Sequence, residues 1–202
     1  MIGIVDYEAG NLRSVETAMR YLGADFFISG EPEKLLTADR MIFPGVGEAK
    51  ASMNVLNKTG LGTAVKDFVK TGKPVLGICL GCQIFFDHSE ERDTKCLGVI
   101  PGEIKEFSSD LGLKVPHMGW NQVEHRGRHQ IFNEIPENSS FYFVHSFYPM
   151  PENLEYEIGR TEYGIEFSSA ACRENVAATQ FHPEKSGKIG LKLLENFINW
   201  EI

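Results

Sequence analysis

The chain has 202 residues, 42% of them apolar and 24% charged, which is enough for one domain with a buried core over residues 1–202. Its net charge of −8 argues against a nucleic-acid partner, because an acidic surface repels phosphate backbones. No apolar run is long enough to cross a bilayer and no cleavable leader is recognisable, so we expect a cytoplasmic protein. The four cysteines are too few for a disulfide framework and are expected to be free thiols.

The first half of the chain alternates short apolar runs with helical patterns. The apolar runs predict strands at residues 2–5, 24–28, 40–43 and 74–78. Helical spacing of apolar residues predicts helices at residues 12–22, 49–56, 61–69 and 80–87. Strands that alternate with helices predict a parallel sheet covered on both faces.

The second half is rich in β-branched and aromatic residues with turn residues between them. It predicts strands at residues 97–107, 120–124, 140–147, 155–163, 165–172 and 177–181, some of them antiparallel at one side of the sheet. A closing helix has Ser186 as its predicted N-cap and an apolar face made of Gly190, Leu193, Leu194, Phe197 and Ile198. We expect a three-layer α/β domain with mixed strand directions.

Two turns follow predicted strands of this sheet, Pro44–Gly47 and Gly77–Gly81. In open α/β sheets, ligands bind at the carboxyl ends of the strands. Glycines two residues before and after Cys79 match a strand-to-helix nucleophile elbow, in which a side chain at either glycine would clash with neighbouring backbone. A helix N-terminus favours the thiolate and leaves the Leu80 amide free to meet an oxyanion. A buried cysteine that only packs is the structural alternative.

The cysteines also allow two other chemistries. Cys79 and Cys82 form a C-x-x-C at a helix start, as in thiol–disulfide oxidoreductases, but that reading leaves the rest of the chain unexplained. We expect Cys82 to be a packing residue of the helix. A zinc site needs a second ligand pair. The remaining candidates are isolated or lie in a polar stretch expected to be a solvated loop: Cys96, Cys172, His125 and His129.

The segment Gln180–Glu184 follows another apolar run and contains His-Pro-Glu. In extended chain, His182 and Glu184 project to the same side, and Pro183 favours an extended His182. The carboxylate can then accept from one ring nitrogen and leave the other to exchange a proton with a thiol. A lone histidine is usually structural, but this placement opposite a nucleophile turn favours catalysis.

These residues resemble those of the class I glutamine amidotransferases, which combine a Gly-x-Cys-x-Gly elbow with a distant His-Pro-Glu. The similarity extends over essentially the whole chain and includes Asp6, Tyr7, Gly10, Asn11, Pro44–Gly47, Gly77–Gly81, Gln83, Pro116–Asn121, Val144–Ser146 and Gln180–Ser186. Within the family, the chain is most similar to glutaminase subunits that serve histidine biosynthesis. The resemblance implies the family's three-layer, flavodoxin-like α/β fold with a mixed central sheet.

The resemblance implies a catalytic triad of Cys79, His182 and Glu184. The Leu80 amide and an amide of the Val46–Gly47 peptide would form the oxyanion hole. The implied reaction is hydrolysis of L-glutamine to glutamate and ammonia through a glutamyl thioester, without a metal or organic cofactor.

Other implied residues contact the substrate or a partner. The partner would be a cyclase subunit with a (β/α)8 barrel, bound as a heterodimer that receives the ammonia. The substrate residues would be Gln83, His145, Ser146 and Phe147, and the interface residues Asn11, Trp120 and Lys185. Gln83 is a candidate for rejecting glutamate, and an ordinary exposed helix residue is the alternative.

The chain departs from the family pattern at a few positions. Cys82 stands where Met is common, Phe147 where Tyr is common, and Glu8 and Ala9 occupy a turn that usually contains glycine. None of these positions is in the triad. An amidotransferase that supplies ammonia to a different synthetase, such as a sugar-modifying one, would carry the same triad and remains the nearest alternative.

Overall fold

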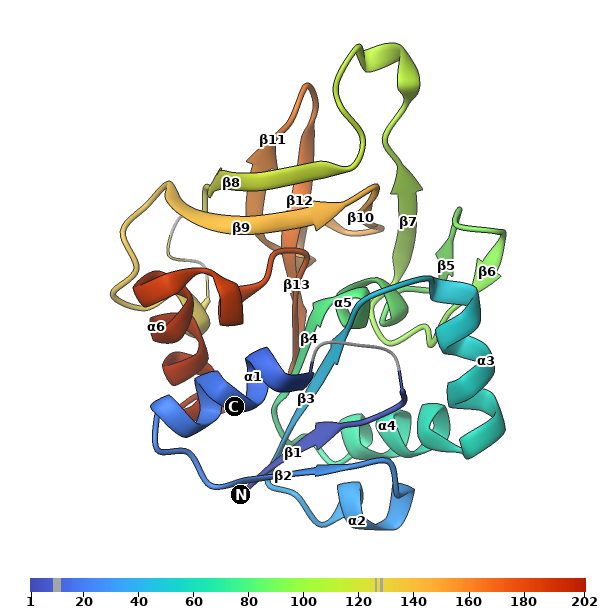
Figure 1. Cartoon of the computed structure of the whole chain (residues 1–202), viewed down its shortest axis with the longest axis vertical. Coiled ribbons are helices and arrows are strands. Elements are labelled where there is room, and N and C mark those ends of the chain that lie inside the picture. Colours follow the sequence, from blue (N-terminus) through green and yellow to red (C-terminus); the bar gives the residue numbers. More distant parts are fainter. Residues whose placement is uncertain (9–11, 126, 128) are drawn as a thin grey trace.

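A seven-stranded sheet forms the centre of the computed structural model, which describes residues 1–8, 12–125, 127 and 129–202 (Figure 1). Its parallel strands are β1 (Ile2–Val5), β2 (Phe26–Ser29), β3 (Arg40–Gly45), β4 (Val75–Cys79) and β13 (Val176–Thr179). Two antiparallel strands, β11 (Glu157–Glu162) and β12 (Glu166–Arg173), complete one edge. The order is β11-β12-β13-β4-β3-β1-β2, so the predicted mixed central sheet is confirmed.

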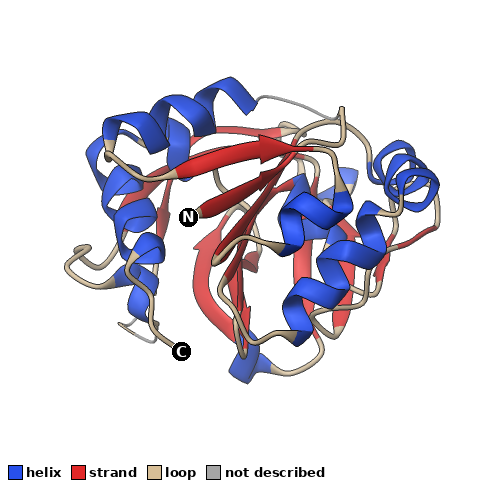
Figure 2. Ribbon diagram, turned by 90° about the horizontal axis from the view of Figure 1, so that it is seen from below, coloured by secondary structure: helices blue, strands red, loops and turns tan. Residues whose placement is uncertain are grey.

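Helices cover both faces of this sheet, as Figure 2 shows. On one face lie α1 (Leu12–Tyr21) and α6 (Gly187–Ile198). On the other lie α2 (Pro32–Leu36), α3 (Ala49–Thr59), α4 (Leu61–Lys70) and α5 (Leu80–Ile84). The predicted three-layer arrangement is therefore confirmed.

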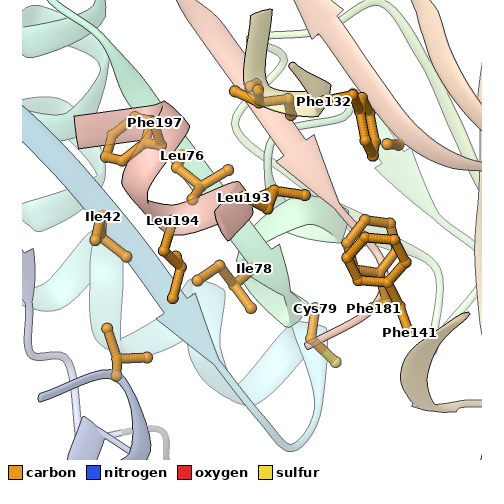
Figure 3. Packing of buried hydrophobic residues seen from close by; sticks show 14 of the residues in the cluster. Ile42, Leu76, Ile78, Cys79, Phe132, Phe141, Phe181, Leu193, Leu194 and Phe197 are labelled. Atoms are coloured by element: carbon orange, nitrogen blue, oxygen red, sulfur yellow. The ribbon is translucent and has the colours of Figure 1, made fainter. Parts of the chain in front are cut away.

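Alternation along β4 explains how one strand serves two cores. Leu76 and Ile78 pack with Leu193 and Leu194 of α6 (Figure 3), while Val75 belongs to the core beneath α3 and α4. Successive side chains of a strand point to opposite faces, so a central strand that is apolar at every position becomes buried on both sides.

Smaller sheets stand beyond the carboxyl ends of the parallel strands (Figure 1). One has the order β10-β7-β5-β6, formed by β10 (Phe147–Pro151), β7 (Gly102–Glu106), β5 (His88–Ser89) and β6 (Thr94–Lys95). The other pairs β8 (His117–Val123) with β9 (Ser139–His145). Four short 3-10 turns complete the described structure: η1 (Ser109–Leu111), η2 (Gln130–Phe132), η3 (Leu154–Tyr156) and η4 (Pro183–Lys185).

Several boundaries differ from the predicted ones. The elements α2, β5, β6 and β10 were not predicted, and the run predicted at 140–147 divides at Ser146 into β9 and β10. The helix predicted at 80–87 ends at Ile84, because the amides of Phe85 and Phe86 bond three residues back. Their carbonyls accept bonds from residues 98–100, which a continuing helix would not allow. In the described part of the chain, no helix has the length and apolar character that crossing a membrane requires.

Candidate functional site

Strand register brings the predicted site together at the carboxyl end of β4. Gly45 of β3 lies beside Cys79, so the turn that follows Gly45 lies beside the start of α5. On the other side, Thr179 of β13 pairs with Ile78, which places Gln180 next to Cys79. Figure 3 shows Cys79 at this end, near Phe141 and Phe181. Segments that are about a hundred residues apart in the chain therefore meet at the cysteine.

The turn at Cys79 has the strained backbone of an elbow. Cys79 adopts φ 55° and ψ −108°, a conformation that L-residues rarely occupy and that surrounding structure must hold. A Cβ at Gly77 would lie 2.7 Å from Phe85 Cε2, and a Cβ at Gly81 would overlap the Phe43 carbonyl oxygen. Both glycines therefore permit the close approach that the sequence analysis predicted for them.

His182 and Glu184 meet through a short turn and not through an extended strand. His182 is extended, with φ −101° and ψ 93°, but residues Pro183–Lys185 form η4. The prediction that alternation in extended chain aligns the two side chains is therefore wrong in its geometry. The pair still forms, because His182 Nδ1–H donates to Glu184 Oε1 at 2.8 Å. This bond fixes the neutral tautomer that leaves Nε2 as an acceptor.

Ser186 fixes η4 beneath β9. The residue precedes α6 at the predicted N-cap position, but its side chain does not cap the helix. Its hydroxyl donates to the His182 carbonyl at 2.6 Å and accepts from the Tyr142 amide at 2.9 Å. The His182 amide also donates to the Tyr142 carbonyl at 2.9 Å. The His182 backbone is therefore held by β9 through Tyr142 and Ser186, and its imidazole is held by the Glu184 carboxylate.

The electrostatics couple His182 to Cys79. Burial opposes the imidazolium, but the Cys79 sulfur and the Glu184 carboxylate outweigh it and raise the pKa of His182 to about 10. The ring is 1% exposed, and Nε2 has no hydrogen-bond partner. A buried, unpaired ring nitrogen beside a thiol is suited to proton exchange with that thiol.

A pocket of about 280 Å³ opens beside Cys79. It is lined by every residue predicted for the oxyanion hole and the substrate: Val46, Gly47, Leu80, Gln83, His145, Ser146 and Phe147. Gln83 is only 5% exposed, so the alternative of an ordinary exposed helix residue is wrong. Gly47 has φ +104°, which an L-residue adopts only with strain.

Glu91 also lines the pocket, and the sequence analysis missed it. Its Oε2 accepts from the Ala49 amide at 2.6 Å, at the first residue of α3. Burial raises the pKa of Glu91, and the Ala49 amide opposes that rise. The residue lies in a polar, acidic stretch between β5 and β6, so no local pattern distinguishes it from a solvated carboxylate.

Gln180 is the second residue whose position was not anticipated. It is fully buried, and its Nε2 lies 3.8 Å from Cys79 Sγ. Its Oε1 accepts from Gln83 Nε2 at 3.0 Å. Only the pairing of β13 with β4 places this side chain at the cysteine, and sequence periodicity does not reveal such a pairing.

Trp120 and Lys185, two of the residues predicted to contact a partner, do not line the pocket. Trp120 and Met118 project from the same face of β8 and are 59% and 60% exposed. Lys185 is half-buried in η4. Asn11 falls outside the described residues.

The remaining cysteines and histidines are structural in character. Burial raises the pKa of Cys82 well above its usual value, and the side chain packs in the core beneath α5, as expected. His125 is 4% exposed and stacks on Phe132, so the solvated loop expected there is wrong. Burial lowers the pKa of His129 to about 4. The described residues contain no cluster that could hold a metal ion.

Known proteins of similar sequence belong to one family. The family model for class I glutamine amidotransferases matches residues 4–200. The chain is 48% identical to the imidazole glycerol phosphate synthase subunit HisH of Maridesulfovibrio salexigens, over 99% of this chain and 97% of that protein. It is 46% identical to the subunit of the same name from Neisseria meningitidis, over 98% of each.

Solved structures show the same fold at lower identity. A structure of PurLQS from Thermotoga maritima matches with a TM-score of 0.78 and 19% identity, over 98% of this chain and 97% of that chain. A crystal structure described as a glutamine amidotransferase matches with a TM-score of 0.73 and 21% identity, over the same shares.

Proposed function

Because this chain belongs to the class I glutamine amidotransferase family, we propose that it is the glutaminase subunit of an imidazole glycerol phosphate synthase. The enzyme hydrolyses glutamine. The observation that carries the proposal is the pocket beside Cys79, in which the predicted nucleophile, oxyanion and substrate residues meet. The identity of 46–48% to subunits of that synthase, over nearly the whole of each protein, supports the choice of reaction and pathway.

In the proposed mechanism, the Cys79 thiolate attacks the side-chain amide carbon of L-glutamine. His182 holds the proton taken from sulfur and gives it to the leaving nitrogen, so that ammonia departs and a glutamyl thioester remains. His182 then takes a proton from water, the hydroxide attacks the thioester, and glutamate leaves as the sulfur is restored. Glu184 keeps the ring oriented and stabilises the imidazolium in both halves.

Backbone amides would stabilise the oxyanion that each attack creates. The Leu80 amide is the first of α5 and has no partner within the helix. An amide of the Val46–Gly47 peptide faces the same end of β4, because Gly45 pairs with Cys79. Each such donor contributes about 3 kcal/mol to transition-state stabilisation.

Glu91 would bind the α-ammonium group of glutamine. Among the described residues that line the pocket, it is the single carboxylate. Its other oxygen is held by the Ala49 amide, so the carboxylate is fixed where a cation can meet it. The segment His145–Phe147 would supply further backbone contacts to the substrate.

The partner would be a cyclase subunit with a (β/α)8 barrel that receives ammonia directly. Transfer within a heterodimer keeps ammonia out of bulk water, where protonation would remove its nucleophilicity. The exposed Trp120 and Met118 are the apolar centre we propose for that interface, and Asn11 and Lys185 are the further residues we propose to contact the partner. We also propose a cytoplasmic location, where reducing conditions preserve the Cys79 thiol.

The test compares wild type with Cys79→Ala, both in complex with the cyclase subunit encoded in the same genome. We expect wild type to release glutamate and ammonia from L-glutamine and the variant to release neither. The glutamine analogue 6-diazo-5-oxo-L-norleucine should label Cys79 in peptide mapping. Full turnover by Cys79→Ala, or labelling of another cysteine, would overturn the assignment. Turnover that depends on a different synthetase would overturn the choice of partner.

A further inference from the structure

A chain of amide hydrogen bonds connects the sulfur of Cys79 to the substrate pocket. Gln180 Nε2 donates to Cys79 Sγ at 3.8 Å, and Gln180 Oε1 accepts from Gln83 Nε2 at 3.0 Å. Gln83 Nε2 also donates to the Phe147 carbonyl at 3.2 Å. Gln180 is fully buried and Gln83 nearly so, which means that water does not compete for these bonds.

The donor and acceptor roles of both glutamine amides follow from one backbone carbonyl. The Phe147 oxygen can only accept, so the Gln83 group that faces it must be the NH2. That same NH2 faces Gln180, whose nearer atom must then be the carbonyl oxygen. The far end of the Gln180 amide is therefore its NH2, which points at Cys79. An amide flip at either glutamine would set two donors or two acceptors against each other.

A buried histidine pair holds the Phe147 end in place. His145 Nδ1 donates to the Phe147 carbonyl at 2.7 Å, which leaves His145 Nε2 to accept from His117 Nδ1 at 2.9 Å. His117 Nε2 in turn accepts from the Asn121 amide at 3.3 Å. Burial lowers the pKa of His145 to about 3 and of His117 to about 4, so both rings are neutral near pH 7. Every donor in this run has an acceptor, which makes the direction of the bonds unique.

We propose that Gln180 is a positioning residue that links the charge on Cys79 to the recognition of glutamine. Its NH2 stabilises the thiolate, because a donor facing sulfur favours the anion. Its carbonyl accepts one N–H of Gln83 and the Phe147 carbonyl accepts the other, so both N–H groups are held away from the ligand. The inference rests on the proposed function and assigns to Gln180 a task that the triad does not perform.

As a consequence, Gln83 presents a hydrogen-bond acceptor to the pocket and no donor. Gln83 lines the pocket, and with both N–H groups taken, its Oε1 is the polar atom left to meet a ligand. An acceptor suits the amide NH2 of glutamine. It leaves the carboxylate of glutamate facing a like partial charge, and such a mismatch is the basis of strong discrimination between near-isosteres.

Two substitutions distinguish the role of the Gln180 NH2 at Cys79 from the role of its carbonyl at Gln83. Gln180→Met keeps the size and removes both hydrogen bonds. Gln180→Glu keeps an oxygen to accept from Gln83 but replaces the NH2 beside Cys79 with a second oxygen. We therefore expect both variants to disturb the thiolate, and Gln180→Met alone to release Gln83 from its orientation.

The first measurement is the pH dependence of iodoacetamide alkylation of Cys79 in the isolated full chain. We expect alkylation at pH 7 to be about tenfold slower in both variants than in wild type. The matched control is Thr179→Val, which removes a buried hydroxyl one residue away that bonds the Phe181 carbonyl and not the cysteine. An unchanged profile in Gln180→Met, with wild-type thermal melting, would overturn the role at sulfur.

The second measurement is steady-state glutamine hydrolysis, with glutamate as competitive inhibitor, in complex with the cyclase subunit. For Gln180→Glu we expect kcat to fall at least tenfold with KM within about twofold of wild type. For Gln180→Met we expect KM to rise and glutamate to inhibit more tightly relative to glutamine. Equal changes of KM in the two variants would overturn the role in recognition.

The two experiments also keep the inference separate from the proposed function. If wild type hydrolyses glutamine and the Gln180 variants match it in both measurements, the inference is wrong and the function stands. If wild type does not hydrolyse glutamine, the function is wrong, while the alkylation profile still decides whether Gln180 acts on the sulfur.

Discussion

Because Gly81 has no Cβ, α5 can start directly at the end of β4. A Cβ there would overlap the Phe43 carbonyl oxygen of the neighbouring strand, and neither backbone can move without parting β3 from the elbow. We expect Gly81→Ala to lower the free energy of unfolding by about 3 kcal/mol and to abolish glutamine hydrolysis. Urea unfolding and glutamate release measure the two effects.

The matched control for Gly81 is Gly62, another helical glycine. A Cβ at Gly62 would lie 3.3 Å from Leu97 Cδ2, the end of a flexible side chain. Because Leu97 can move aside and alanine is a better helix former than glycine, Gly62→Ala in the first turn of α4 should change stability little. Equal destabilisation by the two substitutions would show that a general effect on the helices, and not the clash with Phe43, explains the lost stability of Gly81→Ala.

The protonation of His182 depends on its two partners. Burial acts against the imidazolium, and the Cys79 sulfur is the largest contribution that raises the pKa of His182. We expect Cys79→Ala to lower that pKa, because Glu184 alone must then offset the cost of burial. NMR titration of the imidazole Cε1 proton measures the change. Cys96→Ala, in the other core, should leave the titration as in wild type.

The same shift makes part of the stability depend on pH. The pKa of His182 is raised from 6.5 to about 10 by folding, so the imidazolium contributes stability that is fully present below pH 6.5. That contribution is lost as the pH rises through about 10. We expect the stability advantage of wild type over His182→Gln to shrink by about 2 kcal/mol between pH 6 and pH 10, measured by urea unfolding. A constant difference would contradict the shift.

The limits of sequence reasoning are clear at the residue scale. Cys79 could be predicted as a nucleophile, because flanking glycines and a strand-to-helix boundary are local patterns. Glu91 and Gln180 could not be placed in this way. Glu91 reaches the pocket from a turn between two short strands, and Gln180 reaches Cys79 through the pairing of β13 with β4. Both positions depend on contacts between distant segments, which periodicity does not encode.

At the scale of elements, the parallel strands and long helices could be predicted because their apolar spacing is decided within each segment. The short elements could not. α2 and the strands β5 and β6 have five residues or fewer, which is too short for a period to be recognised. The division at Ser146 follows from pairing, since β9 joins β8 whereas β10 joins β7. A continuous β-rich run thus enters two different sheets.

The turn after β3 has a conformation that glycine makes possible. Gly47 has φ +104°, and a Cβ there would meet nothing within 4 Å, so Gly47→Ala introduces strain without a clash. We expect about 2 kcal/mol of lost stability, or a shift of the turn to an unstrained conformation. A shift of the turn moves the proposed oxyanion amide, so kcat for glutamine should fall at least tenfold.

Gly72 offers a control with the same strain. Its φ is +77°, its Cβ position is also open, and it lies between α4 and β4, at the opposite end of β4 from Cys79. Gly72→Ala should lower the melting temperature comparably and leave kcat at the wild-type value. A loss of kcat in both variants would show that general destabilisation explains the effect.

The molecule as a whole presents its largest exposed aromatic side chain on the β8–β9 hairpin, which also contributes to the pocket. Trp120 is 59% exposed on β8, next to Met118 on the same face, while His117 and His145 of the same hairpin face inward. Trp residues at an interface centre often contribute more than 2 kcal/mol to binding. We expect Trp120→Ala to weaken the complex with the cyclase subunit at least tenfold, measured by isothermal titration calorimetry.

The control for the interface is an apolar residue that is equally exposed in another element. Leu154 is 65% exposed in η3. Leu154→Ala should leave the dissociation constant unchanged, and neither variant should alter thermal melting of the isolated chain. If both substitutions weaken the complex equally, the face of β8 is not the binding centre.

The contrast among the four cysteines makes the protein suited to quantitative assay. Burial raises the pKa of Cys82 well above its usual value and that of Cys96 and Cys172 to about 12, so these thiols stay protonated near neutral pH. Cys79 opens onto the pocket. Intact-mass spectrometry should therefore detect a single adduct per chain, and the adduct yield counts the fraction of a preparation whose site is correctly formed. Specific activity can then be expressed per working molecule instead of per milligram of protein.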